Sequence, residues 1–202
     1  MRIAIIGAGK VGSALGTRWA ATNHDVVFGV RDPGDARHSA LGNVATPGDA
    51  VRNAAVVVVA LPWGATEAVL RTLDVGDAVV VDATNPLAAS ARELEGHPDR
   101  AGAQLVAEWT GSAKVVKAFN TTGAANMTDP TYPHGQPVML ISGDHSEAKA
   151  TVLSLAREIG FDAVDAGPLD AARDLEHLAM IWIRLAYALG NGPDIAFALL
   201  RR

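Results

Sequence analysis

The chain has 202 residues, of which 49% are hydrophobic, and a formal net charge of −5 at pH 7. This length accommodates one well-buried core with a modest extension, and two full domains of ordinary size would be cramped. Cysteine is absent, which excludes disulfides and zinc–thiolate sites, and the scattered Lys and Arg with only 5% aromatic residues argue against a nucleic-acid partner.

The first elements are a strand, a glycine turn and a helix. Residues 2–6 form an apolar run, residues 7–12 carry the spacing G-x-G-x-x-G, and residues 13–21 have a helical pattern. In this order the motif predicts a dinucleotide site, with the phosphates at the start of the helix. One glycine permits the tight turn, the second lets backbone approach the pyrophosphate, and the third lets the helix pack on the strand. The binding residues expected here are Gly7, Gly9, Lys10, Val11 and Gly12.

Apolar runs then alternate with helical segments. Runs rich in Val and Ile are typical of strands buried on both faces, and their alternation with helices predicts a doubly wound parallel sheet of the Rossmann type. The expected strands are residues 25–30, 54–61, 78–82 and 114–119, with a helix at residues 65–73.

The second half continues this pattern less regularly. We expect a strand at residues 137–142, a helix at residues 146–160 with Ser146 as its N-cap, and a strand at residues 161–166. A long helix at residues 170–189 ends the pattern, and no element is predicted between residues 88 and 111. The expected division is a nucleotide-binding core at residues 1–120 and a C-terminal extension at residues 121–202.

No segment predicts a membrane or a secretory route. The opening apolar run is too short for a signal peptide, and the stretch at residues 178–189 contains Arg184 and is too short to span a bilayer. We therefore expect a cytoplasmic protein with no membrane partner. Residues 178–187 are apolar around most of a helix and need cover on more than one side, either within the extension or from a second copy in a homodimer.

The choice between NAD and NADP depends on the end of the second strand. An acid about twenty residues after the last glycine binds the ribose of NAD, and that count reaches Asp32. Counted along the strand, however, the usual position of the acid is Val30, followed by Arg31, and Asp32 begins a turn. Because the strand end fixes direction, we favour NADP, with Arg31 pairing with the 2′-phosphate or stacking on adenine, and Arg37 as a second contact.

Three loops follow the carboxyl ends of expected strands, where ligands lie in open α/β sheets. Each combines short polar groups with Pro or Gly, which suits the edge of a cofactor pocket and is also ordinary turn chemistry. Because they occur in succession, we expect them to surround the nicotinamide. The residues are Leu61, Pro62 and Trp63 in the first loop, Thr84, Asn85 and Pro86 in the second, and Asn120 and Thr122 in the third.

Conventional catalytic groups are scarce. No His shows metal-ligand spacing, so no metal site is expected, and Lys117 is expected to be solvated like most strand-end lysines. No catalytic residue is certain; Asn85, Asn120 and Thr122 are candidates for the hydride-transfer pocket. Hydride exchange between two bound cofactors fits this scarcity, because the cofactors supply the chemistry. The alternatives are an NADP-dependent reductase of a small carbonyl or imine, with Lys117, His134 or Asn120 as proton donor, and a non-enzymatic NADP-binding sensor.

The chain resembles the NADPH-dependent reductases of coenzyme F420, a deazaflavin. The markers are the opening glycines, the run Gly29-Val30-Arg31, the tripeptide Leu61-Pro62-Trp63, residues 114–121 and residues 165–169. The resemblance implies NADP on the first half of the chain. It also implies a deazaflavin stacked on the nicotinamide near residues 84–87 and 120–122, with the extension completing this second site.

Two positions depart from that family's pattern. Family members commonly have Ser where this chain has Val30, which removes one hydrogen bond to the 2′-phosphate, and some have His at the position of Asn120. The sequence of residues 117–121, Lys-Ala-Phe-Asn-Thr, is also similar to the cytosolic reductase domain of membrane metalloreductases, which pass hydride from NADPH to a flavin. The leading hypothesis is therefore an oxidoreductase that moves hydride between NADP(H) and either F420 or a flavin, FMN or FAD.

Overall fold

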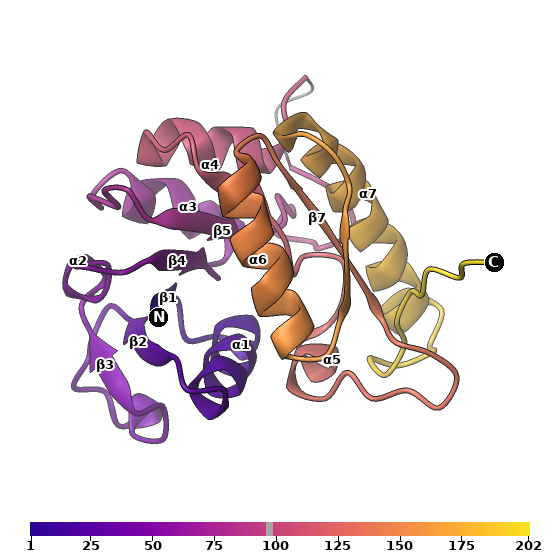
Figure 1. Ribbon diagram of the computed structural model, residues 1–202, viewed down its shortest axis with the longest axis horizontal. Helices are drawn as coiled ribbons and strands as arrows, with labels where there is room; N and C mark the ends of the chain where they lie inside the picture. Colours follow the sequence, from indigo (N-terminus) through magenta and orange to yellow (C-terminus); the bar gives the residue numbers. More distant parts are fainter. Residues whose placement is uncertain (96–98) are drawn as a thin grey trace.

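The computed structural model describes residues 1–95 and 99–202, and it shows an eight-stranded sheet with helices on both faces (Figure 1). The strand order is β3-β2-β1-β4-β5-β6-β7-β8, which confirms the predicted Rossmann-type fold. The strands are β1 (Arg2–Ile6), β2 (Asp25–Gly29), β3 (Asn43–Ala45), β4 (Val56–Val59), β5 (Val79–Asp82), β6 (Val115–Lys117), β7 (Val138–Gly143) and β8 (Asp162–Asp165). The α-helices are α1 (Lys10–Ala21), α2 (Pro47–Ala50), α3 (Trp63–Leu70), α4 (Gly102–Thr110), α5 (Ala124–Thr128), α6 (Ser146–Glu158) and α7 (Ala172–Ile183).

The sheet separates two hydrophobic cores. Successive side chains of a strand point to opposite faces, and in β1 Ile3 and Ile5 belong to one core while Ala4 and Ile6 belong to the other. The first core contains apolar residues of α1 and α6, and the second contains apolar residues of α2, α3 and α4. Strands covered on both faces must be apolar throughout, which explains the unbroken run of valines in β4.

Parallel pairing brings the loops together at one edge. Strands β2, β1, β4, β5 and β6 are parallel neighbours, so their carboxyl ends meet at the same edge of the sheet. The loops after these strands therefore lie next to one another, as the sequence predicts. This edge also holds the glycine turn, because the turn follows β1 directly.

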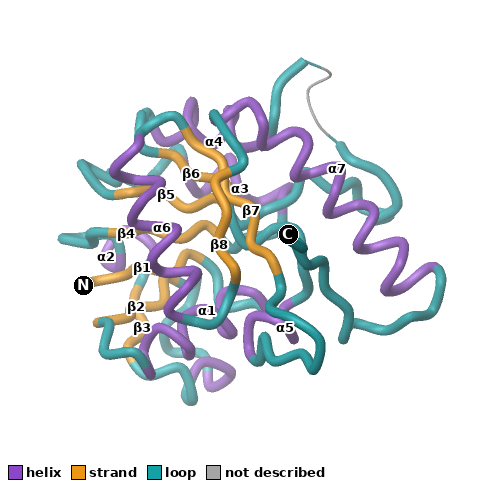
Figure 2. The backbone as a smooth tube through the Cα atoms, turned by 45° about the vertical axis from the view of Figure 1, so that its right-hand side comes forward, coloured by secondary structure: helices purple, strands orange, loops and turns teal. Residues whose placement is uncertain are grey.

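The parallel pattern breaks at β7, which is antiparallel to β6. To add a parallel strand, the chain must first return to the opposite end of the strands, usually through a crossover helix. The segment between β6 and β7 contains only the five-residue helix α5, so the chain turns back from the edge that it has reached. Strand β8 then pairs parallel to β7, after the thirteen-residue helix α6, and Figure 2 shows the two strands side by side.

The predicted long helix is present as a continuous helical stretch. It consists of a 3₁₀ turn at Leu169–Ala171, then α7, then a π-helical segment at Arg184–Ala188. The tail that follows packs back on the fold: Ile195 O accepts hydrogen bonds from Asn126 Nδ2 and Trp182 Nε1, and Val138 N donates to Phe197 O. The sheet runs through residue 120, and the division into residues 1–120 and 121–202 stays a prediction.

Several short elements were not predicted. Strand β3 and helices α2 and α5 have three to five residues, too few to show a period. Helix α4 lies within the stretch that gave no prediction; its N-cap, Ala101, has no side chain able to cap it. The prediction of Ser146 as N-cap was wrong by one residue, because His145 Nδ1 accepts the hydrogen bond from Ala148 N. Within the described residues, every helix falls short of the length and hydropathy needed to cross a membrane.

Candidate functional site

The glycine turn lies between β1 and the first turn of α1. Gly7 has φ +105°, a conformation that side chains rarely adopt, and a Cβ there would lie 2.5 Å from Ala60 O. A Cβ on Gly12 would lie 2.0 Å from Gly7 O, so only glycine allows α1 to approach this closely. Gly9 differs from both, because a Cβ there meets no atom within 4 Å. Gly7 and Gly12 are therefore required by the fold, whereas Gly9 faces open space in front of the helix.

This contrast gives a matched pair of variants. Gly12→Ala is expected to lower the free energy of unfolding by about 1–3 kcal/mol or more, because its methyl group overlaps backbone. Gly9→Ala is expected to keep wild-type stability and to weaken NADPH binding roughly tenfold, because the methyl group blocks one charge-assisted hydrogen bond to the phosphates. Urea unfolding and fluorescence titration measure the two quantities. A Gly9→Ala variant that binds NADPH like the wild type would show that the phosphates lie elsewhere.

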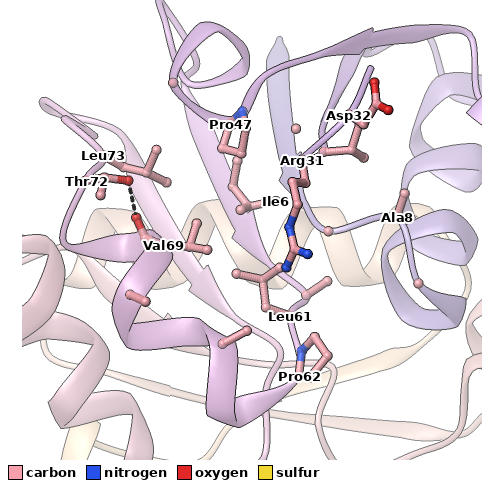
Figure 3. Close-up of a pocket in the computed structure, with 18 of the residues that line it drawn as sticks. Ile6, Ala8, Arg31, Asp32, Pro47, Leu61, Pro62, Val69, Thr72 and Leu73 are labelled. Atoms are coloured by element: carbon pink, nitrogen blue, oxygen red, sulfur yellow. Dashed lines mark hydrogen bonds between the residues drawn. The ribbon is translucent and has the colours of Figure 1, made fainter. Parts of the chain in front are cut away.

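A cavity of about 820 Å³ extends from the glycine turn to the end of β2. We call it the Arg31 cavity; Figure 3 shows that the Arg31 side chain reaches across it towards Leu61, while the carboxylate of Asp32 points away. Of the predicted residues, it is lined by Gly7, Gly9, Arg31, Arg37, Leu61 and Pro62. His38, which no motif in the sequence indicates, lines it as well.

Asp32 also lines the Arg31 cavity, but the position at the end of β2 where a ribose-binding acid usually lies is not occupied by an acid. Val30 takes that position and is buried in the first core. Asp32 is exposed and accepts a hydrogen bond from Gly34 N at 3.0 Å, so it closes a turn as expected. Among the described residues Arg31 forms no ion pair, which leaves its guanidinium free for an anion. This arrangement favours a phosphate over a ribose hydroxyl.

Arg37 is less available than the sequence suggests. Its Nε and Nη2 atoms donate to Asp35 Oδ2 at 2.9 and 2.6 Å. The hydrogen bonds from the Arg37 side chain and backbone lower the pKa of Asp35 to about 2, so the pair is ionised at neutral pH. Arg37 therefore already has a partner, and Arg31 is the stronger candidate for phosphate binding.

A second cavity of about 580 Å³ lies at the carboxyl ends of β4 and β5. We call it the Trp63 cavity. It shares Gly9, Ala60, Leu61 and Pro62 with the Arg31 cavity, so the two adjoin at the glycine turn. Its predicted residues are Gly9, Lys10, Val11, Leu61, Pro62, Trp63, Thr84 and Asn85. Leu87, at the end of the predicted loop at residues 84–87, also lines it, as do Ala88, Ala89 and Glu95 from the stretch whose structure the sequence did not predict.

Two asparagines join the loops after β5 and β6. Asn85 Nδ2 donates to Asn120 O at 2.9 Å, and Asn120 Nδ2 donates to Asn85 Oδ1 at 3.0 Å. Phe119, just before Asn120, has φ +60°, which is rare for a bulky residue and costs about 1–3 kcal/mol. Such strain is retained where the surrounding structure requires it. Here it turns the chain so that Asn120 meets Asn85. Asn120 itself is buried and lines neither cavity.

The prediction that Lys117 is solvated was wrong. Its side chain is fully buried, and Nζ donates to Asp82 Oδ2 at 2.9 Å, Thr84 O at 2.8 Å and Glu176 Oε1 at 2.9 Å. Burial alone would lower the pKa of Lys117, but the charges of Asp82 and Glu176 and their hydrogen bonds outweigh it and raise the pKa above its ordinary value. Lys117 is therefore a fixed cation behind the Trp63 cavity, with all three N–H groups engaged.

The remaining candidates lie outside both cavities. Thr122 Oγ1 accepts a hydrogen bond from Asn126 Nδ2 at 2.7 Å, and Pro86 follows Asn85 without lining either space. His134 lines a separate hollow of about 170 Å³ beside the C-terminal tail. The proton donors considered for a carbonyl reductase, Lys117, His134 and Asn120, thus all lie away from the Trp63 cavity lining. Within the described residues, no cluster of three His, Asp or Glu side chains is suited to hold a metal ion.

Comparison with known proteins identifies the family. Residues 2–86, which contain the glycine turn, Arg31 and the loops after β4 and β5, match the family model "NADP oxidoreductase coenzyme F420-dependent". The F420-dependent NADP reductase of Methanothermobacter marburgensis is 30% identical over 207 residues, covering 92% of this chain and 92% of the relative. The chain belongs to the F420-dependent NADP oxidoreductase family. Members of this family are NADP-dependent oxidoreductases, so the predicted family and the predicted NADP binding are confirmed at this level.

Two further relatives extend the comparison. A crystal structure described as a putative F420-dependent NADP reductase from Arthrobacter sp. FB24 is 29% identical, covers 100% of both chains and has a TM-score of 0.86. Metalloreductase STEAP3 of Rattus norvegicus is 31% identical over 183 residues, which cover 89% of this chain. The matched region is 36% of the length of that metalloreductase, so the similarity concerns only part of it. The chain is thus also related to the reductase domains of metalloreductases, as the sequence suggests.

Proposed function

We propose that the protein transfers a hydride between NADP(H) and a flat-ring acceptor, either the deazaflavin F420 or a flavin. The observation that carries the proposal is the pair of adjoining cavities that share Gly9, Leu61 and Pro62. The Arg31 cavity offers a phosphate the guanidinium of Arg31, which forms no ion pair with any residue that the structure describes, and the Trp63 cavity has mainly apolar walls for a ring. Two ligands in these spaces would meet at the shared residues.

We place NADP(H) in the Arg31 cavity in a single orientation. The 2′-phosphate pairs with Arg31, and the pyrophosphate crosses Gly9 and Lys10, where the free N–H groups and the positive dipole end of α1 face it. The nicotinamide then extends towards Thr84 and Asn85 at the carboxyl end of β5. Two features of the chain support this placement: the open space at Gly9 and the position of Thr84 and Asn85 in the lining of the adjoining cavity.

The acceptor ring occupies the Trp63 cavity. Leu87, Ala88 and Ala89 give it apolar contacts, and Trp63 provides an aromatic wall. Trp109 packs against Trp63, with 5.2 Å between the two ring centroids, and supports this wall. NADPH gives up one hydride, with both electrons of the C–H bond, and the acceptor takes that hydride and one proton from solvent. The chain contributes proximity and orientation, which account for much of the rate in such transfers.

Mixing the purified protein with NADPH and each of F420, FMN and FAD tests the proposal. We expect loss of NADPH absorbance at a rate proportional to protein concentration with at least one of these acceptors. Tight NADPH binding without oxidation by any acceptor would contradict the proposal and favour the non-enzymatic sensor. Oxidation only with small carbonyls or imines would favour the alternative reductase.

We also propose that the protein is a homodimer. Ile181, Tyr187 and Leu189, on and after α7, are 51%, 64% and 70% exposed. Apolar side chains gathered at one helix end are typical of contact surfaces. Sedimentation velocity of the purified chain distinguishes one copy from two.

A further inference from the structure

A buried network of charged groups lies behind the Trp63 cavity. We call Lys117, Asp82 and Glu176 the charged triad. The three side chains come from β6, from β5 and from α7, and each is at most 3% exposed. The triad holds one positive and two negative charges, so burial leaves it with an unbalanced negative charge. Such a group needs further partners, because an uncompensated buried charge is strongly unfavourable.

The start of α4 supplies the missing partner. Glu176 Oε2 accepts a hydrogen bond from Gly102 N, the first residue of this nine-residue helix, at 3.1 Å. The positive end of the helix dipole therefore faces the carboxylate of Glu176, which shares the single positive charge of Lys117 with Asp82. In this way the triad fixes the positions of α4 and α7 relative to the sheet.

The triad also clamps the loop that carries Asn85. Asp82 Oδ1 accepts hydrogen bonds from Thr84 N at 2.9 Å and from Thr84 Oγ1 at 2.7 Å. Lys117 Nζ donates to Thr84 O at 2.8 Å. Both backbone polar groups of Thr84 are thus held by ionised side chains. The next residue, Asn85, lines the cavity and is bound to Asn120.

The part of the cavity wall formed by Trp63 rests on the same network. A methyl group on Gly102 would lie 2.9 Å from Glu176 Oε1 and 3.1 Å from the ring of Trp63. The backbone of Gly102 is therefore packed between the carboxylate and the indole. A displacement of the Glu176 carboxylate would therefore move two parts of the cavity wall. It would move Thr84 through Lys117, and Trp63 through Gly102.

We propose that Lys117 and Glu176 are positioning residues for hydride transfer, through which the C-terminal helix α7 sets the geometry of the Asn85 and Trp63 walls. The inference rests on the proposed function, because it assigns these residues to that reaction. Neither residue touches substrate; each acts through Thr84 or Gly102. A displacement of about 1 Å between reacting groups lowers rates on the order of 100-fold, so a network that holds both walls has a large effect on the transfer rate.

Glu176→Gln is the variant of choice, because the amide keeps the size of the side chain but brings a donor against Lys117 or against Gly102 N. Stopped-flow single turnovers with saturating NADPH and FMN, and with F420, measure the transfer rate; fluorescence titration measures the dissociation constant for NADPH. We expect the saturated rate to fall at least about tenfold and the dissociation constant to change less than threefold. Glu158→Gln on α6 is the matched control; its ion pair with His24 lies outside both cavities, and both quantities should stay at wild-type values.

A merely structural role predicts a different result. The variant would then lose thermal stability, while its folded molecules, assayed well below the unfolding transition, transferred hydride within twofold of the wild-type rate; that outcome overturns the inference. Should Glu176→Gln fail to fold, Gly102→Ala replaces it, since its methyl group pushes on both Glu176 and Trp63, and the same two outcomes apply.

Failure of the proposed function has its own signature. A wild-type protein that reduces no acceptor contradicts that function, and the fluorescence polarisation of bound NADPH then reports how firmly the nicotinamide is held. Lower polarisation in Glu176→Gln than in wild type, at full occupancy, supports the positioning role. Equal polarisation contradicts it.

Discussion

Replacing Lys117 with Met is expected to lower the free energy of unfolding by about 3–5 kcal/mol. Met fills much of the same volume, but it leaves Asp82 and Glu176 buried without a cation. The free energy of unfolding of a typical domain is about 5–15 kcal/mol, so the variant should be much closer to its unfolding threshold. Urea denaturation followed by circular dichroism measures the difference.

Lys114→Met, on the same stretch of chain, is the control for this effect. Lys114 pairs with the exposed Asp77, and exposed pairs contribute about 0–1 kcal/mol. A Lys117→Met protein whose unfolding free energy lies within about 1 kcal/mol of wild type would show that the triad is readily replaced by apolar packing.

The pH dependence follows from the direction of the Lys117 shift. Its pKa in the folded protein lies above the ordinary value of 10.5, so the stabilisation is fully present below that value. It is lost only as the pH rises through the raised pKa. The difference in stability between wild type and Lys117→Met should therefore be constant in the neutral range and shrink in strongly alkaline solution.

Arg31→Ala is expected to weaken NADPH binding by about 10- to 100-fold, the range for loss of one or two hydrogen bonds to a charged group. NADH, which lacks the 2′-phosphate, should bind the variant within about threefold of its affinity for wild type. Isothermal titration with both nucleotides measures the change in their ratio. This prediction assigns the preference for NADP to one side chain, which forms no ion pair within the described part of the chain.

Arg37→Ala provides the comparison, because Arg37 lines the same cavity but is already paired with Asp35. Arg37→Ala should lower the affinity for NADPH less than Arg31→Ala does. Equal losses of NADPH and NADH affinity in Arg31→Ala would show that the guanidinium stacks on adenine instead of binding the phosphate.

The parts of the fold that were predictable from sequence are those with local signals. The glycine spacing and the runs of valine are contiguous, so the strands, the turn and the loops at their carboxyl ends follow from short windows of sequence. The position of Arg31 followed in the same way, from the distance along a single strand. The helix at residues 102–110 was not predictable in this way, because its N-cap, Ala101, has no side chain that could cap it and mark its start.

The charged triad was not predictable because its members are distant in sequence. Asp82 lies 35 residues before Lys117, and Glu176 lies 59 residues after it. A strand-end lysine is ordinarily solvated, and nothing beside Lys117 in the sequence signals a buried carboxylate. The antiparallel direction of β7 was missed for a related reason: it depends on the short connection after β6 and not on the composition of either strand.

Direct hydride transfer between the two ligands is tested by following the transferred hydrogen itself. NADPH deuterated at the reactive C4 position of the nicotinamide is mixed with the protein and F420, whose reduction places hydrogen on a carbon atom, and the reduced product is analysed by mass spectrometry. We expect one deuterium in each reduced deazaflavin, and none in a parallel reaction without protein. Reduced deazaflavin free of deuterium, or no reduction of F420 or of any flavin by NADPH, would contradict direct hydride transfer between two ligands held at Gly9, Leu61 and Pro62.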